Sequence, residues 1–242
     1  MSALVMVRGI HKAHASRGLF GRTRGEALAG VDFEIHPGEW VVVAGESGCG
    51  KTTLARILAG LEVPDKGEVL VEYNVANPRL LRSKVAWIPQ DPGRSLNPHF
   101  TARAAILEPI EIRRLPRERL EECAARAGLE EDLLSRRVWE LSGGQKARVA
   151  IARALTLEPS LLILDESLAA LDIALQEQIL RALLDQSKRS AMSCLFIAHE
   201  IALLEQTKSR IELMDKGNFV DKASIVWREW RAAQPQWAGD NG

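Results

Sequence analysis

The chain has 242 residues, of which 46% are hydrophobic and 26% are charged, as in a globular protein of one large domain or two small lobes. Lys plus Arg and Asp plus Glu both number 32, so the formal net charge is zero. This balance argues against a protein that holds nucleic acid by bulk electrostatics, and we expect no nucleic-acid partner.

The three cysteines, Cys49, Cys123 and Cys194, lie far apart and form no CxxC or CxxH pair. This spacing argues against a zinc site and against a disulfide framework, and it favours a reducing, intracellular setting. No apolar run approaches the roughly 20 residues needed to span a bilayer, and residues 1–8 lack the apolar stretch of a signal peptide. We therefore expect a soluble protein, or one that attaches to a membrane only through partners.

Short β-branched runs alternate with longer helical stretches, which predicts an α/β fold with a largely parallel sheet. Residues 4–8 and 31–35 have the pattern of strands, and between them we expect a Gly- and Arg-rich loop at 17–26. The unbroken apolar run at 40–44 predicts a strand that is buried on both faces.

The middle of the chain predicts a change of architecture. A helix from Thr52 to Gly60 and a strand at 85–88 belong to the α/β core. From Asp91 to about Glu140, prolines interrupt the sequence and residues 117–127 are strongly helical, which predicts a small helical lobe inserted into the core.

The last third returns to the α/β pattern, with strands at 161–164 and 194–198 and a hairpin at 211–221. The segment 227–242 is a tail that carries three tryptophans. We expect one domain over 1–242, divided into an α/β core (1–90 and 155–226), a helical lobe (91–154) and the tail (227–242).

The residues that follow the strand at 40–44 match the phosphate-binding pattern GxxxxGK[ST], and a predicted helix follows them. In this pattern the backbone N–H groups and the helix N-terminus converge on phosphates. We expect Lys51 to reach the β- and γ-phosphates, Thr52 to ligate Mg²⁺ and Thr53 to hold the α-phosphate. The phosphate-binding residues predicted here are Gly45, Glu46, Ser47, Gly48, Cys49, Gly50, Lys51, Thr52 and Thr53.

Two acids, Asp165 and Glu166, stand immediately after the apolar run at 161–164. Ligands of such sheets bind at the carboxyl ends of the strands. Asp165 therefore qualifies as a Mg²⁺ ligand, and Glu166 as the general base that polarises an attacking water. An ordinary surface pair of acids is the alternative, which the phosphate loop upstream makes a minor one.

The segment Leu141-Ser142-Gly143-Gly144-Gln145, placed before a predicted helix at 146–157, resembles the signature of the ATP-binding cassette (ABC) transporter ATPases. The resemblance extends over residues 4–222, with the motifs in the family's order. It implies a P-loop NTPase core of mostly parallel strands, antiparallel N-terminal strands and an inserted helical lobe. ATP and Mg²⁺ are the implied cofactors.

The resemblance also implies roles for single residues. Gln90 matches the glutamine that contacts Mg²⁺ or the attacking water, His199 matches the histidine that contacts the γ-phosphate, and Asp172 matches an aspartate that communicates across a dimer. The signature, Leu141 to Gln145, would act in trans on the nucleotide of a second ATPase. In this family two cassettes pair head to tail around ATP, and hydrolysis releases them.

Three features depart from the family pattern. His14 stands where an aromatic residue, often Tyr, usually stacks on adenine, and imidazole offers less area for stacking. The segment between Lys51 and Gln90 is short, which suggests trimmed antiparallel strands. Ala169 replaces a common serine. None of these changes removes a catalytic group, so we expect a hydrolytically competent site.

The sequence after Gln90, QDPGRSLNP, is similar to that of the ATPases of peptide and nickel importers, and the short chain is similar to the second ATPase of nickel or metallophore importers. This implies a second cassette ATPase, two permease subunits and, indirectly, an extracytoplasmic solute-binding protein, with the chain at the cytoplasmic face of the inner membrane. We expect residues 91–109, including Leu96 and Phe100, to dock on the permease. A soluble accessory ATPase, such as one of phosphonate breakdown, is the alternative.

Overall fold

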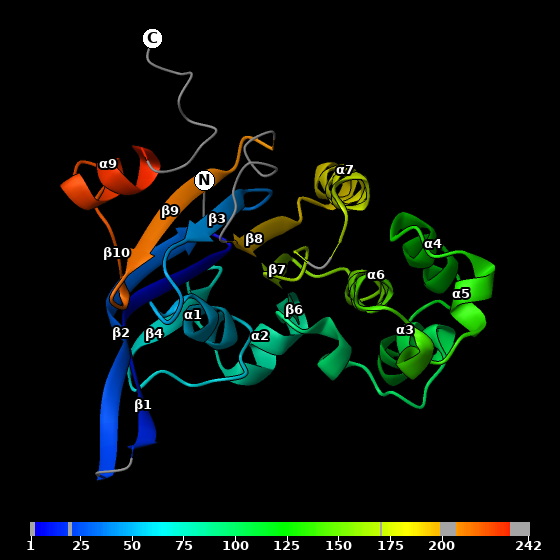
Figure 1. The fold of residues 1–242 in the computed structure, drawn as a ribbon, viewed down its shortest axis with the longest axis horizontal. Coiled ribbons are helices and arrows are strands. Elements are labelled where there is room, and N and C mark those ends of the chain that lie inside the picture. Colours follow the sequence, from blue (N-terminus) through cyan, green and yellow to red (C-terminus); the bar gives the residue numbers. More distant parts are fainter. Residues whose placement is uncertain (1–2, 19–20, 170, 199–206, 233–242) are drawn as a thin grey trace.

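The computed structural model describes residues 1–242 except 1–2, 19–20, 170, 199–206 and 233–242. Its centre is a six-stranded sheet with the strand order β10-β9-β3-β8-β7-β6 (Figure 1). The four pairings from β9 to β6 are parallel, and β10 is antiparallel to β9. The strands of this sheet are β3 (Trp40–Ala44), β6 (Val85–Ile88), β7 (Leu161–Asp165), β8 (Ser193–Ile197), β9 (Arg210–Asp215) and β10 (Asn218–Phe219).

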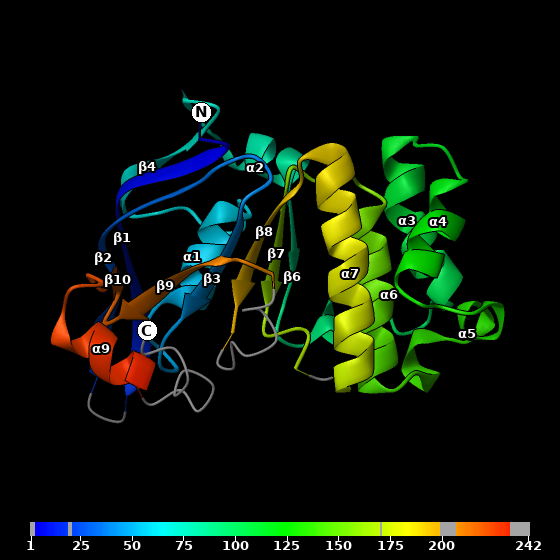
Figure 2. The same cartoon turned by 90° about the horizontal axis from the view of Figure 1, so that it is seen from above.

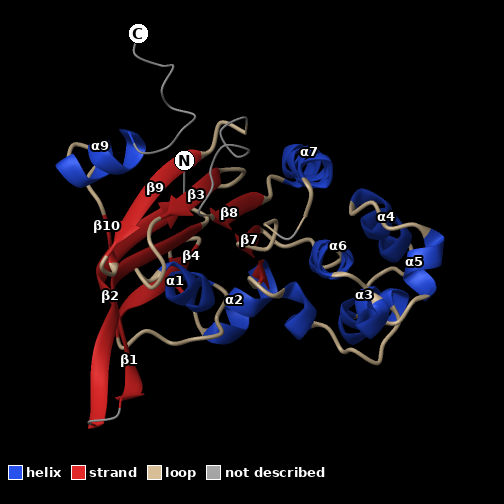
Figure 3. Cartoon of the chain, in the orientation of Figure 1, coloured by secondary structure: helices blue, strands red, loops and turns tan. Residues whose placement is uncertain are grey.

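A second, antiparallel sheet has the order β2-β1-β4-β5 (Figure 3). It consists of β1 (Val5–Gly18), β2 (Gly21–Ile35), β4 (Lys66–Val71) and β5 (Asn74–Val75). The prediction of a loop at 17–26 is wrong. Gly21 to Glu26 are part of β2, and the strand pairing continues to Gly18 opposite Gly21. Glycines and arginines suggested a loop, whereas cross-strand pairing from Ala13 opposite Glu26 to Gly18 opposite Gly21 keeps these residues in the two strands.

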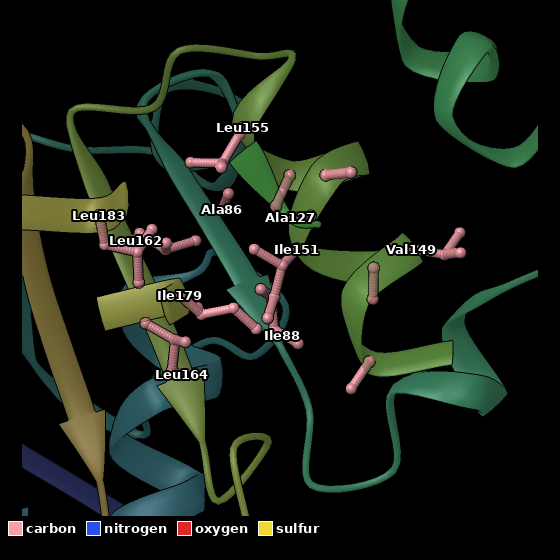
Figure 4. Close-up of a cluster of buried hydrophobic side chains, with 14 of the residues drawn as sticks. Ala86, Ile88, Ala127, Val149, Ile151, Leu155, Leu162, Leu164, Ile179 and Leu183 are labelled. Carbon is pink, nitrogen blue, oxygen red and sulfur yellow. The ribbon is translucent and has the colours of Figure 1, made fainter. Parts of the chain in front are cut away.

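The parallel sheet buries both of its faces, which explains the unbroken apolar runs. Val41 and Val43 of β3 face one cluster, together with α1 (Lys51–Leu58) and the antiparallel sheet. Val42 and Ala44 face a second cluster with α6 (Gly143–Leu155) and α7 (Ile173–Ser190). Figure 4 shows Ile151 of α6 and Ile179 of α7 beside strand residues of β6 and β7.

A helical lobe extends from the β6 edge of the sheet, as the sequence predicts (Figure 2). It contains η1 (Pro92–Ser95), α3 (Ala102–Arg113), α4 (Arg119–Arg126), α5 (Glu131–Ser135) and η2 (Val138–Glu140). The prolines of this segment predict interruptions, but at Pro109 none occurs, because α3 runs through this residue. Ile106, Pro109 and Ile110 form the buried face of α3, and this packing offsets the hydrogen bond that proline removes.

The remaining helices are α2 (Pro78–Lys84), which follows β5, and α9 (Ile225–Ala232) near the C-terminus. In α9 the Trp227 side chain is only 8% exposed, and its ring lies 5.5 Å from that of Trp230. The first part of the predicted tail is therefore a packed helix. Among the described residues, no helix is long and apolar enough to cross a membrane.

Candidate functional site

The phosphate loop connects β3 to α1, as the sequence predicts. Gly45 and Gly50 have φ angles of 145° and 115°, which disfavour any residue with a Cβ atom. A Cβ at Gly45 would lie 2.2 Å from the carbonyl oxygen of Met214, and one at Gly50 would lie 2.4 Å from that of Ala27. These two glycines are therefore required for packing against the flanking strands as well as for the curl of the loop.

Lys51, the first residue of α1, is only 5% exposed. Its Nζ atom donates hydrogen bonds to the carbonyl oxygens of Gly45 (2.7 Å) and Glu46 (2.8 Å). The ammonium group thus lies inside the curl of the loop at the N-terminus of α1. A positive charge combined with a helix N-terminus favours an anion such as a phosphate.

Asp165, the last residue of β7, lies beside the start of α1. The Thr52 hydroxyl donates to Asp165 Oδ1 at 3.3 Å, whereas the buried Oδ2 has no hydrogen-bond partner among the described residues. Burial raises the pKa of this carboxyl, and the nearby Glu166 charge adds to the rise, against the lowering effects of Thr52, Lys51 and the Trp87 indole. An unsatisfied, buried carboxylate oxygen next to a threonine hydroxyl is a donor set that suits Mg²⁺.

Gln90 and Glu166 meet at the carboxyl edge of the sheet because each follows one of two paired parallel strands. Ile88 of β6 pairs with Leu164 of β7, and two residues further along each chain the Gln90 Nε2 donates to Glu166 Oε2 at 2.7 Å. Glu166 has a φ of 50°, and its backbone N–H donates to the carbonyl oxygen of Ile197 at 2.9 Å. This backbone turn places the side chain beyond the strand end rather than in the sheet.

His14, the predicted adenine platform, lies on β1 close to the start of α1. Its Nε2 atom is 3.3 Å from the Thr53 hydroxyl, and its Nδ1 atom is 3.6 Å from a Glu62 carboxylate oxygen. The side chain is 46% exposed. The structure therefore places an imidazole next to the phosphate loop, and Glu62 is a neighbour that the sequence did not reveal, because the contact joins segments that are distant in the chain.

The signature forms the N-terminus of α6. Ser142 is the N-cap: its Oγ accepts from the Gln145 backbone N–H at 3.2 Å, while the Gln145 side chain accepts from the Ser142 N–H at 3.0 Å. The helix starts at Gly143, three residues before the predicted start, because this capping box includes the signature in the first turn. Leu141 is buried and anchors the segment, whereas Ser142 and Gly143 are exposed.

The signature helix α6 and the phosphate-loop helix α1 lie apart in both views, with strands of the parallel sheet between them (Figures 1 and 2). Asp172 is the N-cap of α7 and accepts from the Leu175 N–H at 2.9 Å. The predicted histidine, His199, lies outside the described residues. The described part of the site therefore consists of the phosphate loop, the carboxylate pair, Gln90 and His14.

Comparison with known proteins agrees with this geometry. Residues 28–169 match the family model described as "ABC transporter". A nickel import ATP-binding protein, NikE of Escherichia coli K12, is 37% identical over 232 residues, which cover 90% of this chain and 86% of that protein. The "Probable peptide ABC transporter ATP-binding protein y4tS" of Sinorhizobium fredii is 40% identical over 206 residues, covering 81% of this chain and 58% of its own length.

Solved structures give the same result. The dimeric post-hydrolysis structure of the ATP-binding cassette MJ0796, bound to ADP and Pi, has a TM-score of 0.79 at 28% identity, covering 90% of this chain and 97% of that one. The cbiO1 protein of Clostridium perfringens, part of the ABC transporter complex cbiONQ, has a TM-score of 0.75 at 25% identity, covering 98% and 97%. The chain belongs to the ABC transporter family, as one of its ATP-binding, ATP-hydrolysing domains.

Proposed function

We propose that this chain is the ATP-hydrolysing subunit that energises an importer of the peptide and nickel class, with a dipeptide, nickel or a metallophore as the solute. One observation carries the proposal: the carboxylates, the lysine and the glutamine of a phosphoryl-transfer site converge in a chain that matches a nickel import ATP-binding protein over 90% of its length. In this proposal the solute is selected by other subunits and not by this chain.

In this proposal the phosphate loop, from Gly45 to Thr53, holds the triphosphate of ATP. Lys51 neutralises the β- and γ-phosphates, and Thr53 donates to the α-phosphate. Thr52 and Asp165, with Gln90, would hold Mg²⁺, which when bound draws charge away from the phosphate oxygens. The unpartnered Oδ2 of Asp165 supports this assignment.

Glu166 is the proposed general base. It takes a proton from the water that attacks the γ-phosphorus, the bond to the β–γ bridging oxygen breaks, and ADP and phosphate result. The hydrogen bond from Gln90 at 2.7 Å orients the Glu166 carboxylate toward that position. His199 would contact the γ-phosphate, and His14 would stack on the adenine.

The signature supports a head-to-tail dimer as the working form. The exposed N-terminus of α6 offers backbone N–H groups and the Ser142 hydroxyl to an anion, and it lies apart from the α1 of its own chain. A second cassette, identical or homologous, would bring its γ-phosphate there, with Asp172 communicating across the interface. Two permease subunits would receive the motion, and the extracytoplasmic solute-binding protein would deliver the solute to them, with this chain peripheral to the cytoplasmic face of the inner membrane.

Affinity purification from native membranes in mild detergent, with mass spectrometry of the co-purified proteins, tests this proposal. We expect two permeases and a second cassette ATPase, and the associated solute-binding protein is then titrated with nickel, metallophores and dipeptides. Recovery only from the soluble fraction, with cytosolic enzymes, contradicts the importer proposal and favours the accessory ATPase. If the recovered complex does not hydrolyse ATP, the enzymatic part of the proposal is contradicted.

A further inference from the structure

The loop that follows α1, residues 61–65, fastens the part of β1 that carries His14. The Asp65 backbone N–H donates to the carbonyl oxygen of His11 at 2.8 Å, and the Ala13 N–H donates to Asp65 Oδ2 at 3.0 Å. The Lys12 ammonium donates to the carbonyl oxygen of Val63 at 2.7 Å. The helix α1 starts at the phosphate loop, and the loop after its other end contacts β1. The helix therefore connects the two halves of the candidate nucleotide site, which are the phosphate loop and the part of β1 beside it.

Glu62 is the member of this loop that faces the imidazole. One oxygen, Oε1, lies 3.6 Å from His14 Nδ1, while the Glu62 side chain is only 14% exposed. The other oxygen, Oε2, is buried and forms no hydrogen bond among the described residues. Two further cations approach this carboxylate, Lys12 at 3.5 Å and Arg56 at 3.7 Å.

The two ring nitrogens of His14 therefore have different neighbours, a carboxylate at Nδ1 and the Thr53 hydroxyl at Nε2. A carboxylate attracts a ring N–H, so Glu62 favours a proton on Nδ1. Contacts at both nitrogens restrain rotation of the ring while its faces stay available for stacking.

We infer that Glu62 is a positioning residue for nucleotide-base recognition, which holds the His14 imidazole in the orientation that stacks on adenine. This inference rests on the proposed role of His14, and it goes beyond that role by placing part of the base affinity on a residue that does not touch the nucleotide. Because an imidazole has less stacking area than a tyrosine ring, the orientation of the ring matters more here than it would for a larger aromatic.

Binding measurements with two ligands separate positioning from simple stabilisation. Titration calorimetry with ATP and with inorganic tripolyphosphate, each with Mg²⁺, compares a ligand that has a base with one that does not. The variants are Glu62→Gln, His14→Ala, the double variant, and His14→Tyr with and without Glu62→Gln. Glu72→Gln is the matched control, because Glu72 is 63% exposed and pairs only loosely with Lys84 at 3.9 Å.

We expect Glu62→Gln to weaken ATP binding about three- to tenfold and to leave tripolyphosphate binding unchanged. In the His14→Ala background the Glu62 substitution should add nothing. In the His14→Tyr background ATP affinity should be restored and should no longer depend on Glu62, since a phenol ring needs no carboxylate partner.

If Glu62→Gln weakens the binding of both ligands equally, Glu62 stabilises only the loop and the inference is overturned. If it weakens the binding of neither ligand, Glu62 has no role at the site and the inference is overturned as well. If His14→Ala binds ATP as tightly as the wild type, the base platform itself is wrong and this inference falls with it. Unchanged tripolyphosphate binding in that variant would show that the phosphate-loop part of the proposed function is unaffected.

Discussion

At the scale of single residues, the candidate site contains charged side chains that lie close together and are almost inaccessible to solvent. Lys51 is almost completely buried, and Asp165 is 2% exposed at the edge of the sheet beside it. Burial raises the pKa of Asp165, with a further rise from Glu166. Its native state therefore binds a proton more strongly than its unfolded state does, and the ionised carboxylate lowers the free energy of unfolding above that pKa.

Replacing Asp165 with Asn should separate stability from nucleotide binding. The amide removes the buried negative charge and keeps an oxygen that can accept from Thr52, so without ligand the melting temperature near pH 7 should stay the same or rise. With Mg-ATP, the increase in melting temperature seen for the wild type should be lost. A thermal-shift assay measures both values, and a lower melting temperature of the ligand-free variant would contradict the assignment of Asp165 as a destabilising charge.

At the scale of elements, Arg210 connects the two sheets and the turn before β3. Its guanidinium donates to the Glu39 carboxylate and to the Glu212 carboxylate at 2.6 Å each, and to the Glu34 carbonyl oxygen at 2.6 Å. Burial would raise the pKa of Glu39, but the hydrogen bonds from Arg210 and from the His36 backbone, with the charge of Arg210, outweigh it and lower the pKa. Glu39 therefore stabilises the native state above its unfolded pKa.

Glu39→Gln should lower the free energy of unfolding near pH 7 by about 1–2 kcal/mol, since a charge-assisted hydrogen bond becomes a neutral one. The difference from the wild type should shrink as the pH falls through the lowered native pKa, where Glu39 loses its charge. Urea denaturation at several pH values checks this. The exposed Glu118→Gln serves as control, and a pH-independent difference would contradict the electrostatic explanation.

The segment between Gln90 and α3 also belongs to the element scale, and here the sequence prediction needs a correction. Leu96, expected to dock on a permease, is 5% exposed and packs in the core below the lobe. Phe100 is half-buried against the same cluster, whereas Asn97 and His99 are exposed. The alternation of buried and exposed positions could not be read from a short irregular segment that lacks a helical or strand period.

His99→Glu should therefore reduce solute uptake while basal ATPase activity of the purified chain stays unchanged, because it adds a charge on the exposed side of this segment. Uptake by cells and hydrolysis by purified protein are measured in parallel. Arg181→Glu, on the exposed face of α7, is the control. Normal uptake by the His99 variant would contradict docking here, whereas Leu96→Glu should lower the yield of folded protein, since it buries an unpaired charge.

At the scale of the whole molecule, the signature and the phosphate loop of one chain lie on different parts of the structure, so the proposed composite site would need a second cassette. Glu166→Gln should retain ATP binding, lose hydrolysis by at least a hundredfold and accumulate an ATP-dependent dimer. Light scattering after gel filtration should give twice the 26.7 kDa monomer mass, or a heterodimer when the second ATPase is added.

Adding Ser142→Asp to Glu166→Gln should abolish that dimer without unfolding the chain. Aspartate is as good an N-cap as serine, so α6 should keep its first turn, while the carboxylate repels the γ-phosphate of the other subunit. A dimer that persists with Ser142→Asp would contradict the trans role of the signature. A monomer under all conditions, with the second ATPase present, would contradict the dimer itself.

The sequence by itself determined the class of fold and the places of the candidate site residues along the chain. Buried parallel strands appear as unbroken apolar runs, and a phosphate loop, a strand-end acid pair and the signature are local patterns that carry their own geometry. The helical lobe and the strands at 85–88, 161–164 and 211–214 are confirmed. The roles assigned to the site residues stay predictions, both those of the phosphate loop, the carboxylate pair and the signature and those of Gln90, His14, Asp172 and His199.

Only the tertiary structure decided which distant segments meet. The Gln90–Glu166 hydrogen bond arises because β6 pairs with β7, and the His14–Glu62 contact arises because the loop after α1 reaches β1. The long β1–β2 hairpin, the unbroken α3 at Pro109 and the burial of Leu96 were missed, since each depends on packing against other elements rather than on local preference. Contacts of this kind form because they lower the free energy of the whole folded chain. A short stretch of sequence does not show which distant segments will pack against it.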